Sequence, residues 1–285
     1  MKHSFKLFTA AACIALALNS CDKKDPLATP YTPGTAASLT ATATSSAPAT
    51  ADSSSIVNTF TWTTASYDRY PDSTVKYTVQ LDSAGKNFSN PVILATFTGP
   101  SIRTVALTAK QLNSFLMDGR GYPATVPVDL EIRVVTSKSN FNEQYSSNIA
   151  AYHYTPYIPA MPQVAPVPVT TMPVNNELYM VGDMTAGGWN NPVPVPSQKL
   201  TRTGNIYSLI LHSNGTGQYL LLPVNGDWGH KYAVQNSADP ALQGYFGYNV
   251  GSNFNSNFNG PALPGTYLFR YDVSTGAYFL VRVGY

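Results

Sequence analysis

Cysteine is almost absent from this chain of 285 residues, which contains only Cys13 and Cys21. Cys13 lies within the apolar run from Leu7 to Leu18, which follows a basic start and is too short to span a bilayer, as in a signal peptide. We therefore predict that residues 1–20 are an export signal that is removed. The mature chain then keeps one cysteine and forms no internal disulfide, so core packing must hold its fold together.

Charge is equally scarce, since Asp, Glu, Lys and Arg make up only 11% of the residues. Removing Lys2 and Lys6 with the signal leaves 15 of the 17 basic residues, which equals the 15 acidic ones. A nucleic-acid-binding protein presents a basic face, so this balance argues against nucleic acid as a partner. A surface built mainly from Ser, Thr, Asn, Tyr and Gln suits neutral polyhydroxylated partners better than ionic ones.

Motifs of catalysis and of cofactor binding are missing as well. The four histidines show no metal-ligand spacing, and the chain has neither a Gly-x-Ser-x-Gly elbow nor a phosphate-binding loop. Most acidic residues of the second half fall at predicted turns, whereas glycoside hydrolysis needs two carboxylates held across one cleft. We predict no cofactor, no metal site and no enzymatic activity. A glycan-degrading enzyme with an unrecognised site is the alternative.

Cys21 ends the sequence Leu18-Asn19-Ser20-Cys21, with a small residue just before it and an aliphatic residue three positions before it. This pattern resembles the lipobox of bacterial lipoproteins, so we expect Cys21 to be lipidated and held in outer-membrane lipid. The charged residues 22–25 resemble surface-export signals of Bacteroidetes lipoproteins. Ordinary signal cleavage, with Cys21 as a plain thiol, is the alternative. Residues 21–36 are predicted to be a tether, because they have too few large apolar residues to form a core.

Residues 37–155 have the pattern of a small immunoglobulin-like β-sandwich. Alternating apolar residues separated by turns predict strands at 56–62, 75–81, 92–97 and 128–135, with a weaker candidate at 37–43. The spacing also predicts one short helix with Thr108 as N-cap, Leu112, Phe115 and Leu116 inward, and Gly119 at its end. We expect Trp62 to be a core residue of this domain.

Residues 156–174 are a proline-rich segment with Pro156, Pro159, Pro162, Pro166, Pro168 and Pro173 among Ala, Val and Thr. Prolines spaced in this way disfavour helices and central strands and favour an extended, semi-rigid spacer. We place the domain boundary here, and we expect this linker to be able to hold the two domains apart.

Residues 175–285 are predicted to form a second β-sandwich, of a size common among carbohydrate-binding modules and immunoglobulin-like spacers alike. Strands are expected at 206–211, 218–223, 231–234, 266–271 and 277–283, the last two as a hairpin. The whole chain is therefore predicted to be all-β, with two tandem β-sandwich domains.

The stretch 177–191 combines a period-2 strand with a glycine-rich turn that carries Trp189. Such a turn either displays the Trp for binding or uses it to close the end of the core. A second Trp, Trp228, is soon followed by Lys231 and Tyr232. Sugar binding requires flat aromatic faces for pyranose rings and a few polar side chains for the hydroxyls. These four residues are the candidate glycan-binding residues.

The segment 252–260 alternates four Asn residues with Phe254 and Phe258. As a strand, it would place amides on one face and rings on the other. The alternative is an Asn-rich surface loop whose two Phe side chains turn inward.

Three features together resemble the SusE/SusF-like outer-membrane lipoproteins of Bacteroidetes: the Cys21 anchor, Phe60-Thr61-Trp62 with the strand at 77–82, and the segment 178–189. The resemblance covers nearly the whole mature chain. It implies a SusE-type immunoglobulin-like domain and a C-terminal module that holds starch-type glucan on an aromatic pair. That pair would be Trp189 and Trp228, with Lys231 bonding to sugar hydroxyls. Better-known members carry several such modules, whereas this chain has length for one.

These observations predict a non-catalytic, lipid-anchored outer-membrane protein, exposed at the cell surface. We expect it to capture a starch-like glucan or another neutral polysaccharide for an uptake system, with a transporter complex as a further partner. The alternative is a structural or docking subunit of the uptake complex, in which both domains are spacers and the Trp residues are buried.

Overall fold

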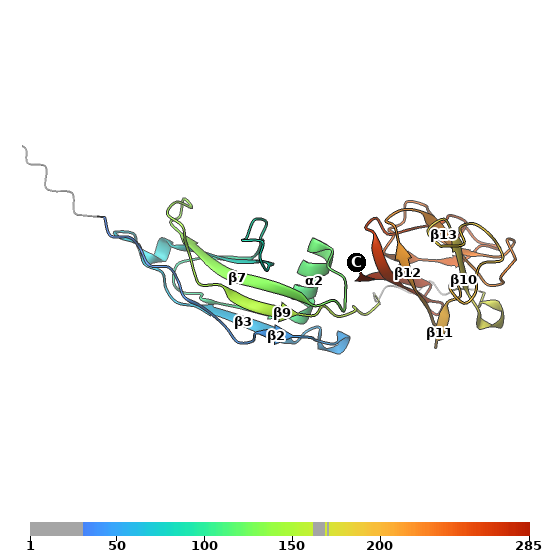
Figure 1. Ribbon diagram of the computed structural model, residues 1–285, viewed down its shortest axis with the longest axis horizontal. Helices are drawn as coiled ribbons and strands as arrows, with labels where there is room; N and C mark the ends of the chain where they lie inside the picture. Colours follow the sequence, from blue (N-terminus) through green and yellow to red (C-terminus); the bar gives the residue numbers. More distant parts are fainter. Residues whose placement is uncertain (1–30, 162–168, 170) are drawn as a thin grey trace, which may run out of the picture.

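The structure is a computed structural model that describes residues 31–161, 169 and 171–285. The predicted signal peptide, the Cys21 anchor, most of the tether and the centre of the proline-rich linker lie outside the described residues. Regular structure is almost entirely β and forms two sandwiches along the chain (Figure 1). The predicted all-β class with two tandem β-sandwich domains is confirmed.

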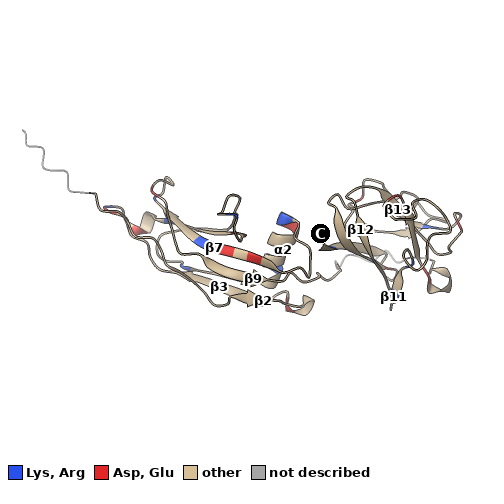
Figure 2. Cartoon of the chain, in the orientation of Figure 1, with Lys and Arg blue, Asp and Glu red and all other residues tan. Residues whose placement is uncertain are grey.

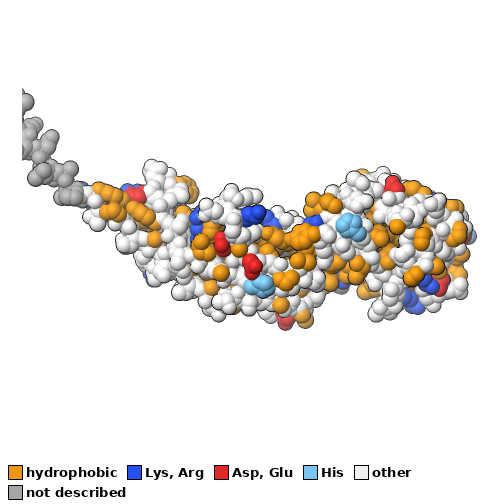
Figure 3. Space-filling view, in the orientation of Figure 1, with side chains coloured by type: hydrophobic (Ala, Val, Ile, Leu, Met, Phe, Trp, Pro, Cys, Tyr) orange, Lys and Arg blue, Asp and Glu red, His pale blue; other side chains and the backbone are white. Residues whose placement is uncertain are grey.

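The surface of both sandwiches is largely uncharged. Figure 2 shows few Lys, Arg, Asp and Glu residues, most visibly as a short row along β7 (Val128–Ser137). Hydrophobic side chains appear between uncharged polar ones over the face in Figure 3. Within the described residues, no helix is both long enough and apolar enough to cross a bilayer.

The N-terminal sandwich has one sheet with the strand order β1-β3-β6 and another with the order β2-β9-β7-β4-β5, with β8 paired to β7. Its other strands are β1 (Leu39–Ala41), β2 (Ser45–Ser46), β3 (Ile56–Trp62), β4 (Lys76–Ser83), β5 (Val92–Thr98), β6 (Thr104–Thr108), β8 (Tyr145–Ser146) and β9 (Ala150–Tyr154). Short 3-10 helices lie at Thr50–Asp52 and Asp72–Thr74. All strands predicted for this domain are confirmed, whereas β2, β6, β8 and β9 were not predicted.

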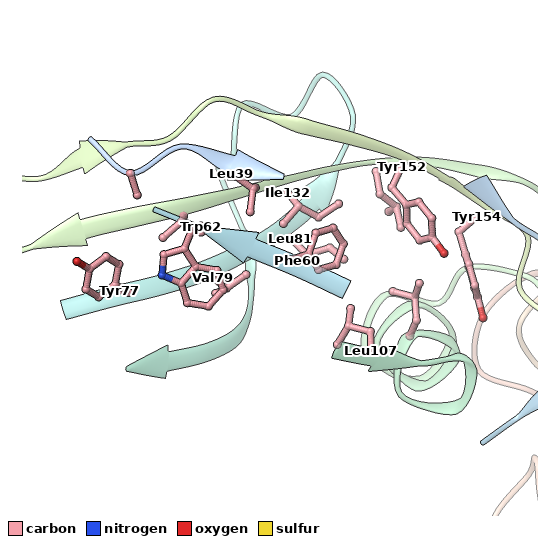
Figure 4. Close-up of a cluster of buried hydrophobic side chains, with 14 of the residues drawn as sticks. Leu39, Phe60, Trp62, Tyr77, Val79, Leu81, Leu107, Ile132, Tyr152 and Tyr154 are labelled. Carbon is pink, nitrogen blue, oxygen red and sulfur yellow. The ribbon is translucent and has the colours of Figure 1, made fainter. Parts of the chain in front are cut away.

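Trp62 lies in the core between the two sheets, as predicted. Its ring centroid is 6.4 Å from that of Tyr77 and 5.8 Å from that of Phe97. Figure 4 shows Trp62 beside Tyr77 and Val79 of β4, whose alternate residues point into the sandwich. Period-2 burial of this kind is what holds a disulfide-free domain together.

The single α-helix of the described residues, α2 (Ala109–Arg120), begins as predicted but ends later. Thr108 is the N-cap, and its hydroxyl accepts from the backbone N–H of Gln111. The predicted end at Gly119 is wrong. The helix runs on to Gly121, which has φ 68 and donates its N–H to Met117. Gly121 rather than Gly119 takes the left-handed conformation that ends helices.

The C-terminal sandwich pairs a sheet of order β11-β12-β18-β19-β15 with one of order β10-β13-β14-β16, in which β17 also pairs with β13. The strands are β10 (Tyr179–Gly182), β11 (Thr201–Thr203), β12 (Ile206–Ser213), β13 (Gln218–Leu222), β14 (Tyr232–Ala233), β15 (Gln243–Tyr245), β16 (Gly247–Tyr248), β17 (Phe258–Asn259), β18 (Gly265–Asp272) and β19 (Ala277–Gly284). A 3-10 helix at Val174–Asn176 precedes them. The predicted strands and the β18–β19 hairpin are confirmed.

Aromatic rings fill the core of this second sandwich. Tyr219 stacks on Phe258 at 4.8 Å between centroids, and Tyr271 meets Phe258 edge-on at 5.7 Å. The Tyr271 hydroxyl donates to the Tyr219 hydroxyl at 2.8 Å. Burial raises the pKa of both phenols, so neither ionises and the pair stays a neutral core contact.

The two sandwiches contact each other, so the expectation that the linker holds them apart is wrong. Arg282 of β19 donates to the Gly121 carbonyl at 2.7 Å, and the Ala124 N–H donates to the Arg282 carbonyl at 2.7 Å. Arg270 of β18 donates to the Pro159 carbonyl at 2.8 Å. The guanidinium groups thus serve backbone carbonyls at the end of α2 and in the linker, which strand pairing leaves without partners.

Substituting both arginines, Arg270→Ala with Arg282→Ala, should free the two sandwiches from each other. Each arginine contributes charged hydrogen bonds of about 1.5–3 kcal/mol. In solution scattering, the double variant should show a larger maximum dimension and a broader distance distribution than the native chain. Arg202→Ala is the matched control, because Arg202 bonds only locally, to Gly204. Identical scattering from the double variant and the native chain would contradict this account of the junction.

Candidate functional site

The loop that carries Trp189 leaves β10 at a position where only glycine fits. A Cβ atom on Gly182 would lie 2.1 Å from the Gln218 carbonyl oxygen, and its φ is 154. The chain then folds back tightly, since the N–H and hydroxyl of Thr185 both donate to the Gly182 carbonyl, at 2.9 and 2.8 Å. Gly188, at φ 59, completes the turn directly before Trp189.

Two side chains hold this loop on the outer face of its sheet. The buried Gln198 accepts from the Gly187 N–H at 2.8 Å and donates to the Met180 carbonyl at 2.7 Å. Val193 belongs to a small buried cluster outside the main core, together with Tyr179, Val181, Leu220, Leu222 and Ala233. The loop is therefore packed against the sheet, with Trp189 on its solvent side.

Trp228 lies in a second turn, between β13 and β14. The Asp227 carboxylate accepts from the Gly229 N–H at 2.7 Å and is bonded to Nδ1 of His230. The His230 bond first, and the Gly229 bond second, hold the pKa of the Asp227 carboxyl below its ordinary value. Asn249 fixes the other side of the turn, accepting from the Lys231 N–H at 2.8 Å. Polar contacts thus order the turn on both sides of the indole.

Side-chain amides join the two loops. Oδ1 of Asn191 accepts from the Gly226 N–H at 2.7 Å. Asn225 accepts from the Val193 N–H at 2.6 Å and donates to the Val193 carbonyl at 3.1 Å. Each tryptophan lies two residues from the Asn191–Gly226 bond, so both rings emerge where the loops meet.

Both rings are exposed to solvent. Trp189 is 38% exposed and Trp228 is 47% exposed. The hypothesis that Trp189 closes the core is therefore wrong, because the cluster around Val193 fills that space instead. The alternative of a structural or docking subunit assumed that the Trp residues are buried. Their exposure removes this support for it.

Tyr232 does not belong to the surface, which corrects the sequence prediction. It pairs with Leu221 in the sheet and points into the main core, where its ring centroid is 5.3 Å from that of Tyr248. Its hydroxyl donates to the Thr171 carbonyl at 2.6 Å, and burial raises its pKa. Tyr232 supports the site from below and offers no face to a ligand.

Lys231 precedes Tyr232 and, by strand alternation, lies on the opposite side, with Ala233. Ala233 packs beneath the Trp189 loop, so Lys231 belongs to the same outer face. It is partly exposed, and its ammonium group makes no ion pair or hydrogen bond seen among the described residues. Its role as a hydrogen-bond donor to a glycan stays a prediction.

The Asn-rich segment is a surface loop with its rings inward. Phe254 and Phe258 are buried, and only Phe258–Asn259 pair as a strand. Asn257 donates to the Gln218 side chain at 3.0 Å, and Gln218 donates to Asn259 at 3.1 Å. The alternative of a surface loop with its two Phe side chains inward is confirmed, and the amides of Asn257 and Asn259 bond to Gln218.

The acidic residues of the C-terminal sandwich all have local partners. Glu177 bonds to Lys199 and Tyr179, Asp183 to the Gln218 N–H, Asp227 to His230, Asp239 to the Asn236 N–H and Asp272 to Ser274. Among the residues described, no group of three or more His, Cys, Asp or Glu is placed to hold a metal ion. These carboxylates fix turns and strand ends.

Two pockets of the described residues lie away from the loops of Trp189 and Trp228. One pocket of about 300 Å³ lies beside α2, and another of about 540 Å³ lies at the junction of the two sandwiches. Neither is lined by Trp189 or Trp228. A ligand of the two tryptophans would lie along the outer face, as an extended chain can.

The sequence did not predict the residues that join the loops. Asn225-Gly226 is a dipeptide typical of turns, and Asn191 ends the stretch 177–191 that carries Trp189. Neither position signals that its amide reaches a loop more than thirty residues away. The one hint in the sequence is that Asn191 and Asn225 each lie within three positions of a Trp.

A family model described as SusE outer membrane protein matches residues 24–135. The resemblance found in the sequence is confirmed for this N-terminal region, and the description agrees with the predicted outer-membrane location. The crystal structure of SusF from Bacteroides thetaiotaomicron is similar over 87% of this chain, with 19% identity and a TM-score of 0.37. The chain spans about half of that protein, 52% of its length.

Further structural similarity is weaker still. The crystal structure of the FN1–FN3 domains of chicken CNTN1 matches with 13% identity and a TM-score of 0.25, covering 85% of this chain and 68% of that one. The search of curated proteins gave no match.

Tyr232→Phe should lower the free energy of unfolding by about 0.5–1.5 kcal/mol, because the hydrogen bond from the Tyr232 hydroxyl to the Thr171 carbonyl is lost. Trp228→Phe, a change at an exposed ring, should alter stability by no more than about 0.5 kcal/mol. Urea denaturation of the full chain, followed by circular dichroism, measures both. Equal stability losses in the two variants would contradict the assignment of Tyr232 to the core and Trp228 to the surface.

Proposed function

We propose that this chain, whose residues 24–135 match the family model of the SusE outer membrane protein, is a non-catalytic glycan-binding protein. It captures a starch-like glucan or another neutral polysaccharide for an uptake system. The observation that carries the proposal is the pair of exposed indoles, Trp189 and Trp228, on two loops that side-chain amides bond together.

Binding rests on ring contact. Indole faces pack against the apolar C–H faces of pyranose rings, and nearby donors bond to the hydroxyls. Lys231, three positions after Trp228, is the proposed donor to these hydroxyls. Hydrogen bonds exposed to water contribute only about 0.5–1.5 kcal/mol each, so one such site binds with a dissociation constant on the order of micromolar to millimolar.

The arrangement supports capture rather than catalysis. Retaining or inverting hydrolysis uses two carboxyl groups about 5–10 Å apart on either side of a bound sugar. The carboxylate next to Trp228, that of Asp227, is bonded to His230 and Gly229, and the one at the end of β10, that of Asp183, is bonded to Gln218 at 2.5 Å. Both carboxylates form hydrogen bonds that hold the loops carrying Trp189 and Trp228.

The same proposal places the protein in the outer membrane, anchored through lipid on Cys21 and exposed at the cell surface beside a transporter complex. The lipobox-like Leu18-Asn19-Ser20-Cys21 and the family description support this placement. A tethered binder raises the local concentration of polysaccharide near the transporter, even when each contact is weak.

Trp189→Ala and Trp228→Ala should each weaken glycan binding by about 2- to 12-fold, which corresponds to the roughly 0.5–1.5 kcal/mol of an aromatic contact. Affinity electrophoresis through gels containing amylopectin, levan, xyloglucan or pectin measures the retardation. Ile210→Ala is the control, since Ile210 is an exposed apolar residue on the opposite sheet.

Far-UV circular dichroism must stay native in all three variants. Native retardation in both Trp189→Ala and Trp228→Ala would contradict the proposed site, and release of reducing sugars by the purified protein would contradict the absence of catalysis.

Cys21→Ala should abolish palmitate labelling of the protein in cells and move it out of the membrane fraction, because the proposed acylation site is lost. Cys13→Ala is the control and should leave labelling intact, since Cys13 leaves with the predicted signal. Labelling that persists in Cys21→Ala would show that the anchor lies elsewhere.

A further inference from the structure

The end of the N-terminal sandwich farthest from α2 carries an exposed aromatic cluster. It is formed by Tyr31, Tyr70, Phe141 and Tyr145, which we call the aromatic end. Lys76 opens β4 opposite Ser137, the last residue of β7, so the loops that flank these positions gather at one end of the sheet. In Figure 1 this is the end where the described chain begins, and the C-terminal sandwich lies at the other.

Hydrogen bonds and ring contacts order this cluster. The Tyr31 and Tyr145 hydroxyls are 3.3 Å apart, and the Tyr70 hydroxyl donates to Oγ of Ser139 at 2.6 Å. Beneath them the ring centroid of Tyr67 lies 5.4 Å from that of Tyr145 and 6.4 Å from that of Tyr70. The rings are held in place on the sandwich, so they form a preformed surface.

Two of the rings project into solvent. Phe141 is 55% exposed and Tyr31 is 57% exposed. Phe141 has φ 62, a left-handed conformation that an aromatic residue seldom adopts. The ammonium of Lys76 lies 3.8 Å from the centre of its ring, and that of Lys138 lies 5.7 Å from the centre of Tyr70. The loop thus holds the Phe141 ring in solvent beneath the Lys76 ammonium, although burying this ring would stabilise the fold more.

This composition fits the interfacial layer of a membrane. Tyrosine and other amphipathic rings gather at the headgroup level, and lysine side chains reach past them to the water. Three basic and three acidic side chains flank the rings here, namely Lys76, Lys138, Arg69, Asp68, Asp72 and Glu143. The balance suits a mixed headgroup layer, whereas a polybasic patch would be needed to bind a strongly anionic surface by charge alone.

The short length of chain between Cys21 and Tyr31 indicates that the partner of the aromatic end is the membrane. Tyr31 follows Cys21 by ten positions, which span at most about 35 Å when fully extended. Lipid on Cys21 would therefore keep the aromatic end within that distance of the bilayer, where even a weak contact forms because its effective concentration is high.

We propose that the aromatic end rests on the membrane that holds the anchor, with Phe141 and Tyr31 at the level of the lipid headgroups. The inference depends on the proposed lipidation of Cys21 and not on glycan binding. The contact adds a second point of attachment to the lipid anchor. It directs the C-terminal sandwich, joined through Arg270 and Arg282, away from the bilayer.

Depth measurements on the lipidated full-length chain in vesicles of phosphatidylethanolamine and phosphatidylglycerol test this directly. Acylation occupies the Cys21 thiol, so a new cysteine is the single labelling site for an environment-sensitive fluorophore. Phe141→Cys places the label at the aromatic end, and Thr201→Cys places it on the exposed strand β11 of the C-terminal sandwich. A third variant, Asn140→Cys, places it beside an intact Phe141.

The labels at positions 140 and 141 should shift to the blue when vesicles are added. A nitroxide on the lipid headgroup should quench them several-fold more strongly than the label at position 201. Water-like emission and equal quenching at all three positions would overturn the proposal, and so would a chain that fails to float with the vesicles.

Glycan retardation of the same labelled proteins keeps the two proposals separate. If the glycan gel retards the protein while its aromatic end stays in water, only the membrane contact is contradicted. If the aromatic end is buried in the membrane but the gel does not retard the protein, only the glycan site is contradicted.

Discussion

Side-chain amides that bond to the backbone of a distant segment hold the long loops of this protein in place. Asn58 accepts from the Ala43 N–H and donates to the Ala43 carbonyl, at 3.2 and 2.9 Å, and Asn148 does the same with Leu39, at 2.8 and 2.9 Å. Asn225 repeats the arrangement with Val193. A chain with neither internal disulfides nor many charges has few other ways to fix irregular backbone, and a buried amide satisfies a donor and an acceptor at once.

The candidate site depends on these bonds between side-chain amides and distant backbone. Without Asn191 and Asn225, the loops of Trp189 and Trp228 would share only the packing around Val193. With these amides in place, the two loops that carry the exposed rings are bonded to each other, which reduces the ordering that a ligand must cause. The domain junction is also held by side chains that bond to distant backbone, because Arg282 and Arg270 donate to backbone carbonyls of the N-terminal sandwich and the linker. The rings, the junction and the aromatic end thus belong to one elongated body.

How far the sequence predicts this structure depends on the range of the interactions involved. Trp62 and the cap at Thr108 follow from patterns within a few residues and were predicted. The end of α2 was placed two residues early, because two nearby glycines compete and only packing selects Gly121. Tyr232 was misplaced because a two-residue strand gives too short an alternation to show which side faces inward. The junction and the amide bonds join segments far apart in the chain, and no local pattern encodes them.

The central claim is that Trp189 and Trp228 form one glycan-binding face. The chain has three tryptophans, so its indole N–H signals in an NMR spectrum report on this face and on the core separately. Titration with oligosaccharides of the glycan that retards the protein should shift the Trp189 and Trp228 signals together, with one midpoint, and leave that of the buried Trp62 unchanged. Shifts in only one of the two exposed indoles, or in neither while binding is saturated, would contradict the account.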